Sequence, residues 1–187
     1  MDLGGKIIEG KGRPSSDTPT HLELYNAFPS IGGVAHTHSE FATSFVQACR
    51  EIECYGTAHA DAFDGAIPVT RFLTKDEVEK NYELNTGKLI TERFKNLDPV
   101  AMLAVLIAGY APFIWGNNAR DAVKNSLILE RVASMAFRSV ALNPELPPLP
   151  EYLLNKHHLR KHGPEAYFGQ PQKTNSTVPS GPSRKRK

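Results

Sequence analysis

The sequence is poor in cysteine, lacks long apolar runs and has no basic surplus in its main body. Its two cysteines, Cys49 and Cys54, have neither metal-ligand nor redox-motif spacing, so we expect free thiols in a reducing cytoplasm. No apolar segment approaches the roughly 20 residues of a membrane-spanning helix. The sequence therefore predicts a cytoplasmic protein without a membrane partner.

Basic charge is concentrated at the end of the chain. The segment 171–187 holds five of the 22 Lys and Arg residues and no acidic residue. Residues 1–170 hold 17 basic and 20 acidic side chains, a net charge of −3. The main body thus has no electrostatic footprint for nucleic acid, and no nucleic-acid partner is expected.

Length and composition predict one globular domain followed by a tail. The 187 residues, 40% of them hydrophobic and 22% charged, suffice for one packed core, which we assign to residues 1–170. The polar, Pro/Ser-rich segment 171–187 is predicted to be disordered. Its final Arg-Lys-Arg-Lys is either a solvated charge run or a nuclear or anionic-surface signal.

Strand and helix patterns alternate along the main body, which favours a layered α/β domain and leaves the strand order open. Thr74-Lys-Asp-Glu77 fits a capping box that begins a helix. The other helices are expected at 20–28, 40–51, 88–96, about 117–142 and 150–162, and strands at 6–10, 33–38, 57–60 and 104–110.

His36 and His38 form the most informative pair of residues. Alternate residues of a strand point to the same face, so an H-x-H pair brings two imidazoles together. With Asp17 as an oxygen ligand, this set suits zinc or a similar divalent ion. The alternative is two histidines that form hydrogen bonds in a packed interior.

Three further groups could carry chemistry. Asp61 could move protons near a metal site, or it could be a turn or capping residue. Ser15 and Ser16, just before a helix, could bind a phosphate or simply cap that helix. The basic stretch 156–162 could be a solvated helix face or an anion site at a subunit boundary.

Several ordered motifs together resemble the L-ribulose-5-phosphate 4-epimerase branch of the class II aldolase/adducin family. The resemblance covers nearly all of residues 2–170. It implies a three-layer α/β fold with a central, mostly antiparallel sheet flanked by helices. It also implies a homotetramer with active sites between subunits. The motifs are Pro14–His21, Phe28–His38, Gly56–Asp61, Ile67–Arg71 and Leu159–Gln170.

The resemblance also implies a reaction and a cofactor. The substrate would be a phosphorylated pentulose, L-ribulose 5-phosphate, converted to D-xylulose 5-phosphate in arabinose catabolism. Inversion at C4 would proceed by retro-aldol cleavage of the C3–C4 bond and re-addition. One zinc ion per subunit would be held by Asp17, His36, His38 and a third histidine, and would polarise the ketose carbonyl.

The same resemblance assigns roles to other residues. Asp61 would be an acid/base, with Thr57 close by. Ser15 and Ser16 would contact the substrate phosphate. From the neighbouring subunit, His157 and Arg160 would reach the site, Arg160 towards the phosphate; these roles follow from the resemblance alone.

Two positions depart from the family pattern. Tyr110 stands where the third zinc histidine is expected, and a phenol is a poor zinc ligand unless the metal lowers its pKa. Phe168 stands where a catalytic tyrosine is expected and cannot transfer a proton. Losing a positioned acid/base typically costs roughly 10²–10⁴ in rate, so we expect weak activity or none.

A third departure concerns the N-terminal end, and together the departures suggest two alternative hypotheses. The family pattern includes an N-terminal segment that is absent from this sequence, and its absence is expected to uncover sheet edges. A non-catalytic or degenerate family member with an assembly role is therefore one alternative. A sister class II aldolase acting on another sugar phosphate is a second, against which the epimerase-like motifs argue.

Overall fold

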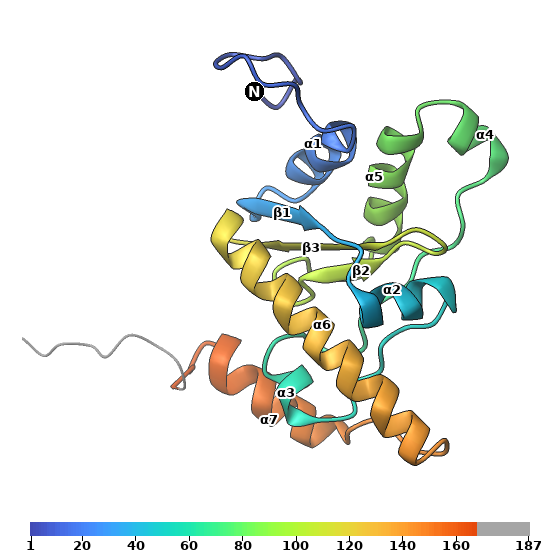
Figure 1. Ribbon diagram of the computed structural model, residues 1–187. Helices are drawn as coiled ribbons and strands as arrows, with labels where there is room; N and C mark the ends of the chain where they lie inside the picture. Colours follow the sequence, from blue (N-terminus) through green and yellow to red (C-terminus); the bar gives the residue numbers. More distant parts are fainter. Residues whose placement is uncertain (168–187) are drawn as a thin grey trace, which may run out of the picture.

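A computed structural model describes residues 1–167. Its centre is a three-stranded antiparallel sheet in the order β1-β3-β2 (Figure 1). The strands are β1 (Gly33–His36), β2 (Ala104–Leu106) and β3 (Pro112–Gly116). Every residue of β3 is buried, as expected for a central strand covered on both faces.

Helices cover both faces of the sheet, so the fold has three layers (Figure 1). In the view of Figure 1, α1 (Thr18–Ala27) and α5 (Tyr82–Arg93) lie above the sheet, whereas α2 (Glu40–Gln47) and α6 (Ala119–Leu142) lie below it. The fully buried Trp115 packs its ring against aromatic side chains at the C-terminal ends of α1 and α5.

Two smaller helices and a C-terminal helix complete the described part of the chain. The helix α4 (Lys75–Glu79) begins with the predicted capping box, in which Thr74 and Glu77 each accept the other's backbone N–H. The one-turn helix α3 (Thr57–Ala60) packs against α7 (Glu151–His162). Figure 1 shows this pair far from α1 and α5.

Two close contacts connect α6 to β1 and to α2. A Cβ atom on Gly33 would lie 2.4 Å from the backbone of Asn118 and Ala119, so only glycine permits this approach. The Glu130 carboxylate of α6 accepts the backbone N–H groups of Phe41 and Ala42 at 2.9–3.1 Å. Glu130 therefore caps α2 from another helix.

The predicted fold class is confirmed, but several predicted elements are not. Residues 6–10 form no strand, and 57–60 form a helix because Gly56 is an extended N-cap and His59 and Ala60 are buried on one side. The strand predicted at 104–110 ends at Leu106, because Gly109 turns the chain with φ +71°. The following strand β3 was not predicted.

Helix positions were predicted better than strand positions. The helix predicted at 40–51 ends at Gln47, and α5 begins six residues before the expected 88. The long helix and the last helix agree with the prediction within two residues. The proposed tail 171–187 and Phe168 lie outside the described residues.

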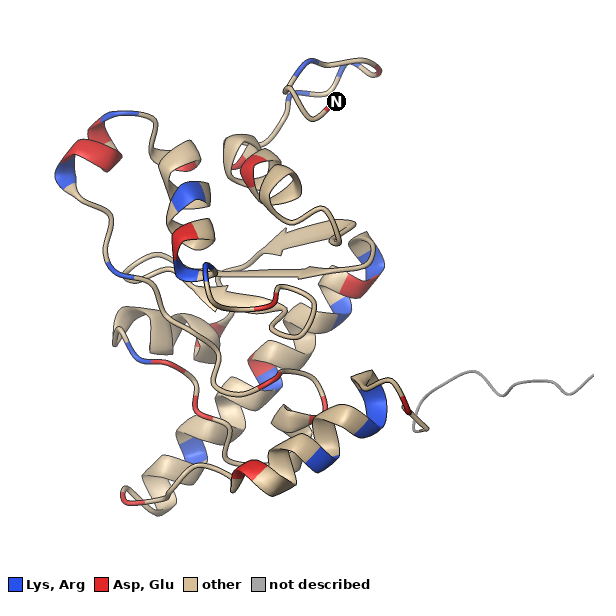
Figure 2. Cartoon of the chain, turned by 180° about the vertical axis from the view of Figure 1, so that it is seen from behind, with Lys and Arg blue, Asp and Glu red and all other residues tan. Residues whose placement is uncertain are grey.

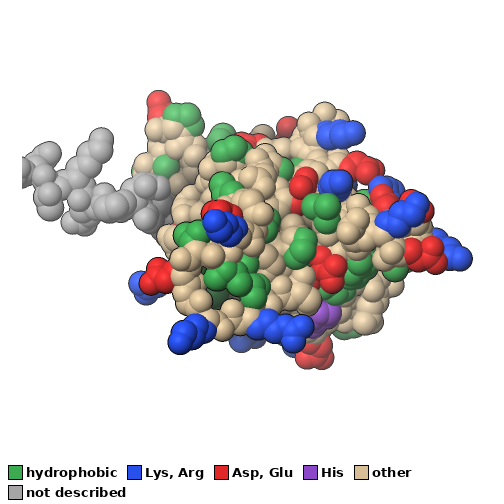
Figure 3. All heavy atoms as spheres, turned by 90° about the horizontal axis from the view of Figure 1, so that it is seen from above, with side chains coloured by type: hydrophobic (Ala, Val, Ile, Leu, Met, Phe, Trp, Pro, Cys, Tyr) green, Lys and Arg blue, Asp and Glu red, His purple; other side chains and the backbone are tan. Residues whose placement is uncertain are grey.

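Within the described residues, the two cysteines differ in exposure, and charges of both signs share one face of the molecule. Cys49 is exposed and Cys54 is buried, and both are free thiols. Figure 3 shows positive and negative side chains mixed over the face that carries α1, without an extended patch of one sign. No helix in residues 1–167 is long and apolar enough to cross a membrane.

Candidate active site

The predicted histidine pair lies at the end of β1. The Nε2 atoms of His36 and His38 are 3.2 Å apart, as the strand period predicted. His36 stacks on Phe113 of β3, and its Nδ1 lies 3.3 Å from the Pro112 carbonyl, to which it can donate. That hydrogen bond leaves the lone pair of His36 Nε2 facing His38.

Asp17 and Tyr110 come to this pair from two other directions. Asp17 is the N-cap residue of α1, and Tyr110 lies in the turn between β2 and β3. The Tyr110 hydroxyl donates to Asp17 Oδ1 at 3.1 Å. The Tyr110 ring centroid lies 4.9 Å from that of His36 and 5.7 Å from that of His38.

Three further residues at this cluster, His21, Tyr82 and Glu83, were not predicted from the sequence as site residues. His21 follows Asp17 by four residues, a spacing that places both on one helix face and that could have identified it. Burial lowers the pKa of His21, whereas the negative charge of Asp17 acts to raise it. Tyr82, at the start of α5, packs its ring 5.7 Å from that of Tyr110, and Glu83 follows it.

Burial and negative charge also act on the predicted ligands. Burial lowers the pKa of His36, and the negative charge of Asp17 opposes this. Burial raises the pKa of Tyr110 far above its ordinary value of 10, and the charge of Asp17 adds to the effect. The imidazole is therefore neutral and the phenol protonated at neutral pH.

Ser15 and Ser16 lie at the N-terminal end of α1, and both are exposed. Ser15 Oγ accepts the backbone N–H of Asp17 at 3.3 Å, and its carbonyl accepts from Thr18. Ser15 therefore has a capping role within this chain. It also lines an open cavity of about 680 Å³, together with His21 and mostly apolar side chains of α1 and the N-terminal segment.

A second cluster forms around Asp61. His157 Nδ1 and Arg160 Nη2 bond its carboxylate at 3.0 and 2.9 Å, and Lys161 Nζ lies 3.1 Å away. All three side chains come from α7, whose basic last turns are visible in Figure 2. Asp61 is thus the acceptor of an ion-pair network and also the C-cap residue of α3, so the turn or capping role that was the alternative is present as well.

The charge network controls the ionisation of Asp61. Burial alone would raise the pKa of this carboxyl group, but the hydrogen bonds from the three α7 side chains outweigh burial and lower the pKa to about 2. The network therefore keeps Asp61 ionised at neutral pH. Thr57, four residues earlier at the start of α3, is exposed.

His59 does not belong to either cluster. It is 4% exposed, and its Nε2 lies 2.8 Å from the Gly65 carbonyl. Burial lowers its pKa to about 4. His59 therefore has a structural role, and it does not supply the missing third ligand of the histidine pair.

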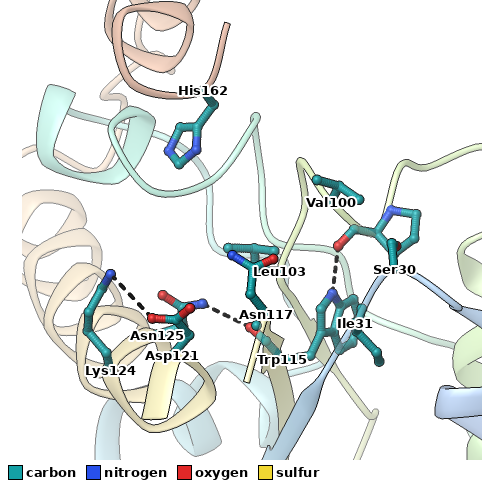
Figure 4. Close-up of a pocket in the computed structure, with 12 residues that line it drawn as sticks. Ser30, Ile31, Val100, Leu103, Trp115, Asn117, Asp121, Lys124, Asn125 and His162 are labelled. Carbon is teal, nitrogen blue, oxygen red and sulfur yellow. Dashed lines mark hydrogen bonds and ion pairs between the residues drawn. The ribbon is translucent and has the colours of Figure 1, made fainter. Parts of the chain in front are cut away.

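A smaller cavity of about 170 Å³ lies where β3 meets the start of α6 (Figure 4). The polar groups at the bottom of this cavity are hydrogen-bonded to one another. Asn125 Nδ2 donates to the Trp115 carbonyl at 2.9 Å, and the Trp115 indole N–H donates to the Pro99 carbonyl at 2.7 Å. Of the site residues and segments predicted from the sequence, His162 of the basic stretch 156–162 lines this cavity, whereas the proposed metal ligands and Asp61 do not.

Comparison with known proteins identifies the family. The profile of the "Class II Aldolase and Adducin N-terminal domain" matches residues 1–137. The chain belongs to this family. L-ribulose-5-phosphate 4-epimerase UlaF of Salmonella paratyphi B is 51% identical over 170 residues, which cover 91% of this chain and 75% of that protein. The same protein of Salmonella typhi gives the same identity and coverage.

Solved structures support the class II aldolase fold. An L-fuculose 1-phosphate aldolase superposes with a TM-score of 0.69 at 22% identity and covers 86% of this chain and 69% of its own. The L-fuculose 1-phosphate aldolase from Glaciozyma antarctica PI12 superposes with a TM-score of 0.65 at 14% identity. At such identities the likeness concerns the fold.

The zinc that the class II aldolase/adducin resemblance implies fits these residues only in part. Two nitrogens bound tetrahedrally to one zinc ion lie about 3.4 Å apart, close to the 3.2 Å between His36 and His38. The Nδ1 contact of His36 with a carbonyl is the usual orientation of a metal-binding imidazole. However, residues 1–167 contain no group of three His, Cys, Asp or Glu side chains that could hold an ion.

Proposed function

We propose that this chain is an L-ribulose-5-phosphate 4-epimerase-type isomerase that interconverts L-ribulose 5-phosphate and D-xylulose 5-phosphate. The observation that carries the proposal is the 51% identity to UlaF epimerases over 91% of the chain. The proposed physiological role is the catabolism of pentoses such as arabinose. The proposed compartment is the cytoplasm, where the free thiols of Cys49 and Cys54 would persist.

The substrate itself restricts the chemistry. The ketose carbonyl at C2 acidifies the hydrogens on C1 and C3 but not the hydrogen on C4. We therefore propose that inversion at C4 proceeds by reversible cleavage of the C3–C4 bond, which needs a base for the C4 hydroxyl proton. Asp61 is the proposed acid/base, and its low pKa keeps it in the acceptor form.

We propose that the two clusters act together across a subunit boundary. Within one chain the Asp61 cluster lies on α3 and α7, away from the histidine pair at the end of β1 (Figure 1). A homotetramer, as the resemblance implies, would bring Asp61, His157 and Arg160 of one subunit to the histidine pair of another. Thr57, at the start of α3, would accompany them.

The proposed phosphate contacts come from both clusters. Ser15 and Ser16 are exposed at the start of α1, and Ser15 lines the larger cavity; a helix N-terminus favours an anion. Arg160 carries a fork of donors that matches phosphate geometry. The proposed ion at the histidine pair is zinc, which when bound supplies Lewis-acid polarisation of a carbonyl.

A specific observation favours a second candidate, a non-catalytic member with an assembly role. Asp17 is engaged by Tyr110, and Phe168, which lies outside the described residues, replaces the expected catalytic tyrosine. In this case the chain would copurify as an assembly with a complete epimerase and would not turn over substrate.

The deciding experiment follows conversion of L-ribulose 5-phosphate to D-xylulose 5-phosphate with zinc supplied. We expect weak turnover by the natural chain and an increase of roughly 10²-fold in Phe168→Tyr, which restores a phenol. Asp61→Asn should abolish turnover, whereas Asp64→Asn, which removes an exposed acid without an ion pair in residues 1–167, should not. Absence of turnover in both the natural chain and Phe168→Tyr would refute the epimerase.

A further inference from the structure

The donor set at the histidine pair is divided into two hydrogen-bonded halves. One half is His36 and His38, whose Nε2 atoms face each other at 3.2 Å. The other half is Asp17, whose Oδ1 accepts the Tyr110 hydroxyl at 3.1 Å. An ion at the imidazole pair would need the carboxylate as its third ligand, and one oxygen of that carboxylate is engaged by the Tyr110 hydroxyl.

Packing holds Tyr110 between the two halves. Its ring lies 4.9 Å from His36 and 5.7 Å from both His38 and Tyr82, measured between centroids. Both imidazoles therefore lie against an aromatic ring, which offers no lone pair to a cation. The only oxygen of this side chain is directed to Asp17 as a donor.

We infer that Tyr110 withholds Asp17 from the imidazole pair, so that this chain retains zinc weakly, and that Tyr110→His completes the metal site. An imidazole is shorter than a phenol, so a histidine at this position would place its nitrogen near the other two rings and could not reach across to Asp17. The substitution would add a nitrogen donor and release an oxygen donor at the same time.

The inference deepens the proposed function and rests on it only for the choice of zinc. Its test therefore measures metal and not turnover. The natural chain, Tyr110→His, Tyr110→Phe and the control Tyr82→Phe are titrated with zinc against a chromophoric chelator. Zinc content is then determined by elemental analysis after dialysis. The unchanged emission of Trp115, the single tryptophan, verifies that each variant is folded.

We expect the natural chain to retain well under one zinc per chain and Tyr110→His to retain about one, with zinc affinity increased at least tenfold. Tyr110→Phe releases Asp17 without adding a donor and should give an intermediate affinity. Tyr82→Phe should match the natural chain, because no hydrogen bond joins Tyr82 to Asp17 within residues 1–167.

Two results would overturn the inference. One is full zinc retention by the natural chain with an affinity equal to that of Tyr110→His. The other is an unchanged affinity in Tyr110→Phe, which would show that the hydroxyl does not withhold the carboxylate. Failure of the epimerase assay with zinc retained as expected would refute the proposed function alone.

Discussion

Asp61 provides the sharpest test of the electrostatic argument. Its side chain is 18% exposed, and its α7 partners His157, Arg160 and Lys161 are 21–29% exposed, so solvent screens the cluster only partly. The pKa of Asp61 is lowered from 3.8 to about 2. A difference of this size corresponds to about 2 kcal/mol by which the ionised Asp61 carboxylate stabilises the folded state at neutral pH.

The pH dependence follows from the sign of this shift. Because the folded pKa is lower than the unfolded one, the contribution is complete above about pH 4 and is lost as pH falls towards 2. The Asp61→Asn substitution should increase the equilibrium constant for the opening of α7 roughly fiftyfold at pH 7 and only about tenfold at pH 3.

Amide hydrogen exchange in α7 measures this opening directly. This helix packs mainly on α3, so it can open while the core around Trp115 stays folded. Each variant is compared with the natural chain at the same pH, since exchange itself depends on pH. The control Asp64→Asn should leave α7 protected. Exchange in Asp61→Asn within about threefold of the natural chain at pH 7 would refute the argument.

Two further substitutions test the packing of β1 and α2 on α6. Glu130→Ala removes the carboxylate that caps α2 and should lower the free energy of unfolding by about 1–2 kcal/mol in urea titrations followed by Trp115 fluorescence. An unchanged urea midpoint would show that water replaces this cap. Gly33→Ala places a Cβ 2.4 Å from α6 backbone and should cost about 3 kcal/mol or more. Gly12→Ala, with no heavy atom within 4 Å of the new Cβ, is its control and should be nearly neutral. Equal stability of the two glycine variants would contradict the close approach.

Local periodicity was sufficient to predict part of the site and of the fold. The two-residue period of a strand predicted that His36 and His38 converge, and their Nε2 atoms are 3.2 Å apart. The long helix α6 was predicted within two residues of its bounds, and the Thr74 capping box predicted α4. These features depend on residues close in sequence, so neighbouring side chains alone decide them.

Short apolar segments were predicted less well. The run 104–116 does not alternate, since both of its strands are buried on both faces, so the pattern did not show where one strand ends and the next begins. The four residues of α3 contain too little pattern to distinguish a helix from a strand. They pack against α7, nearly 100 residues later, and the local pattern does not show this contact.

The sequence by itself determined the family, through the order of its motifs, and the convergence of His36 with His38. Only the tertiary structure decided what the charged and hydroxyl groups bind. Asp61 meets Arg160 across 99 residues, and Tyr110 meets Asp17 across 93. Partners so distant in sequence are chosen by how helices pack against the sheet and each other, because burial of apolar faces sets that packing and the polar groups must pair where it leaves them.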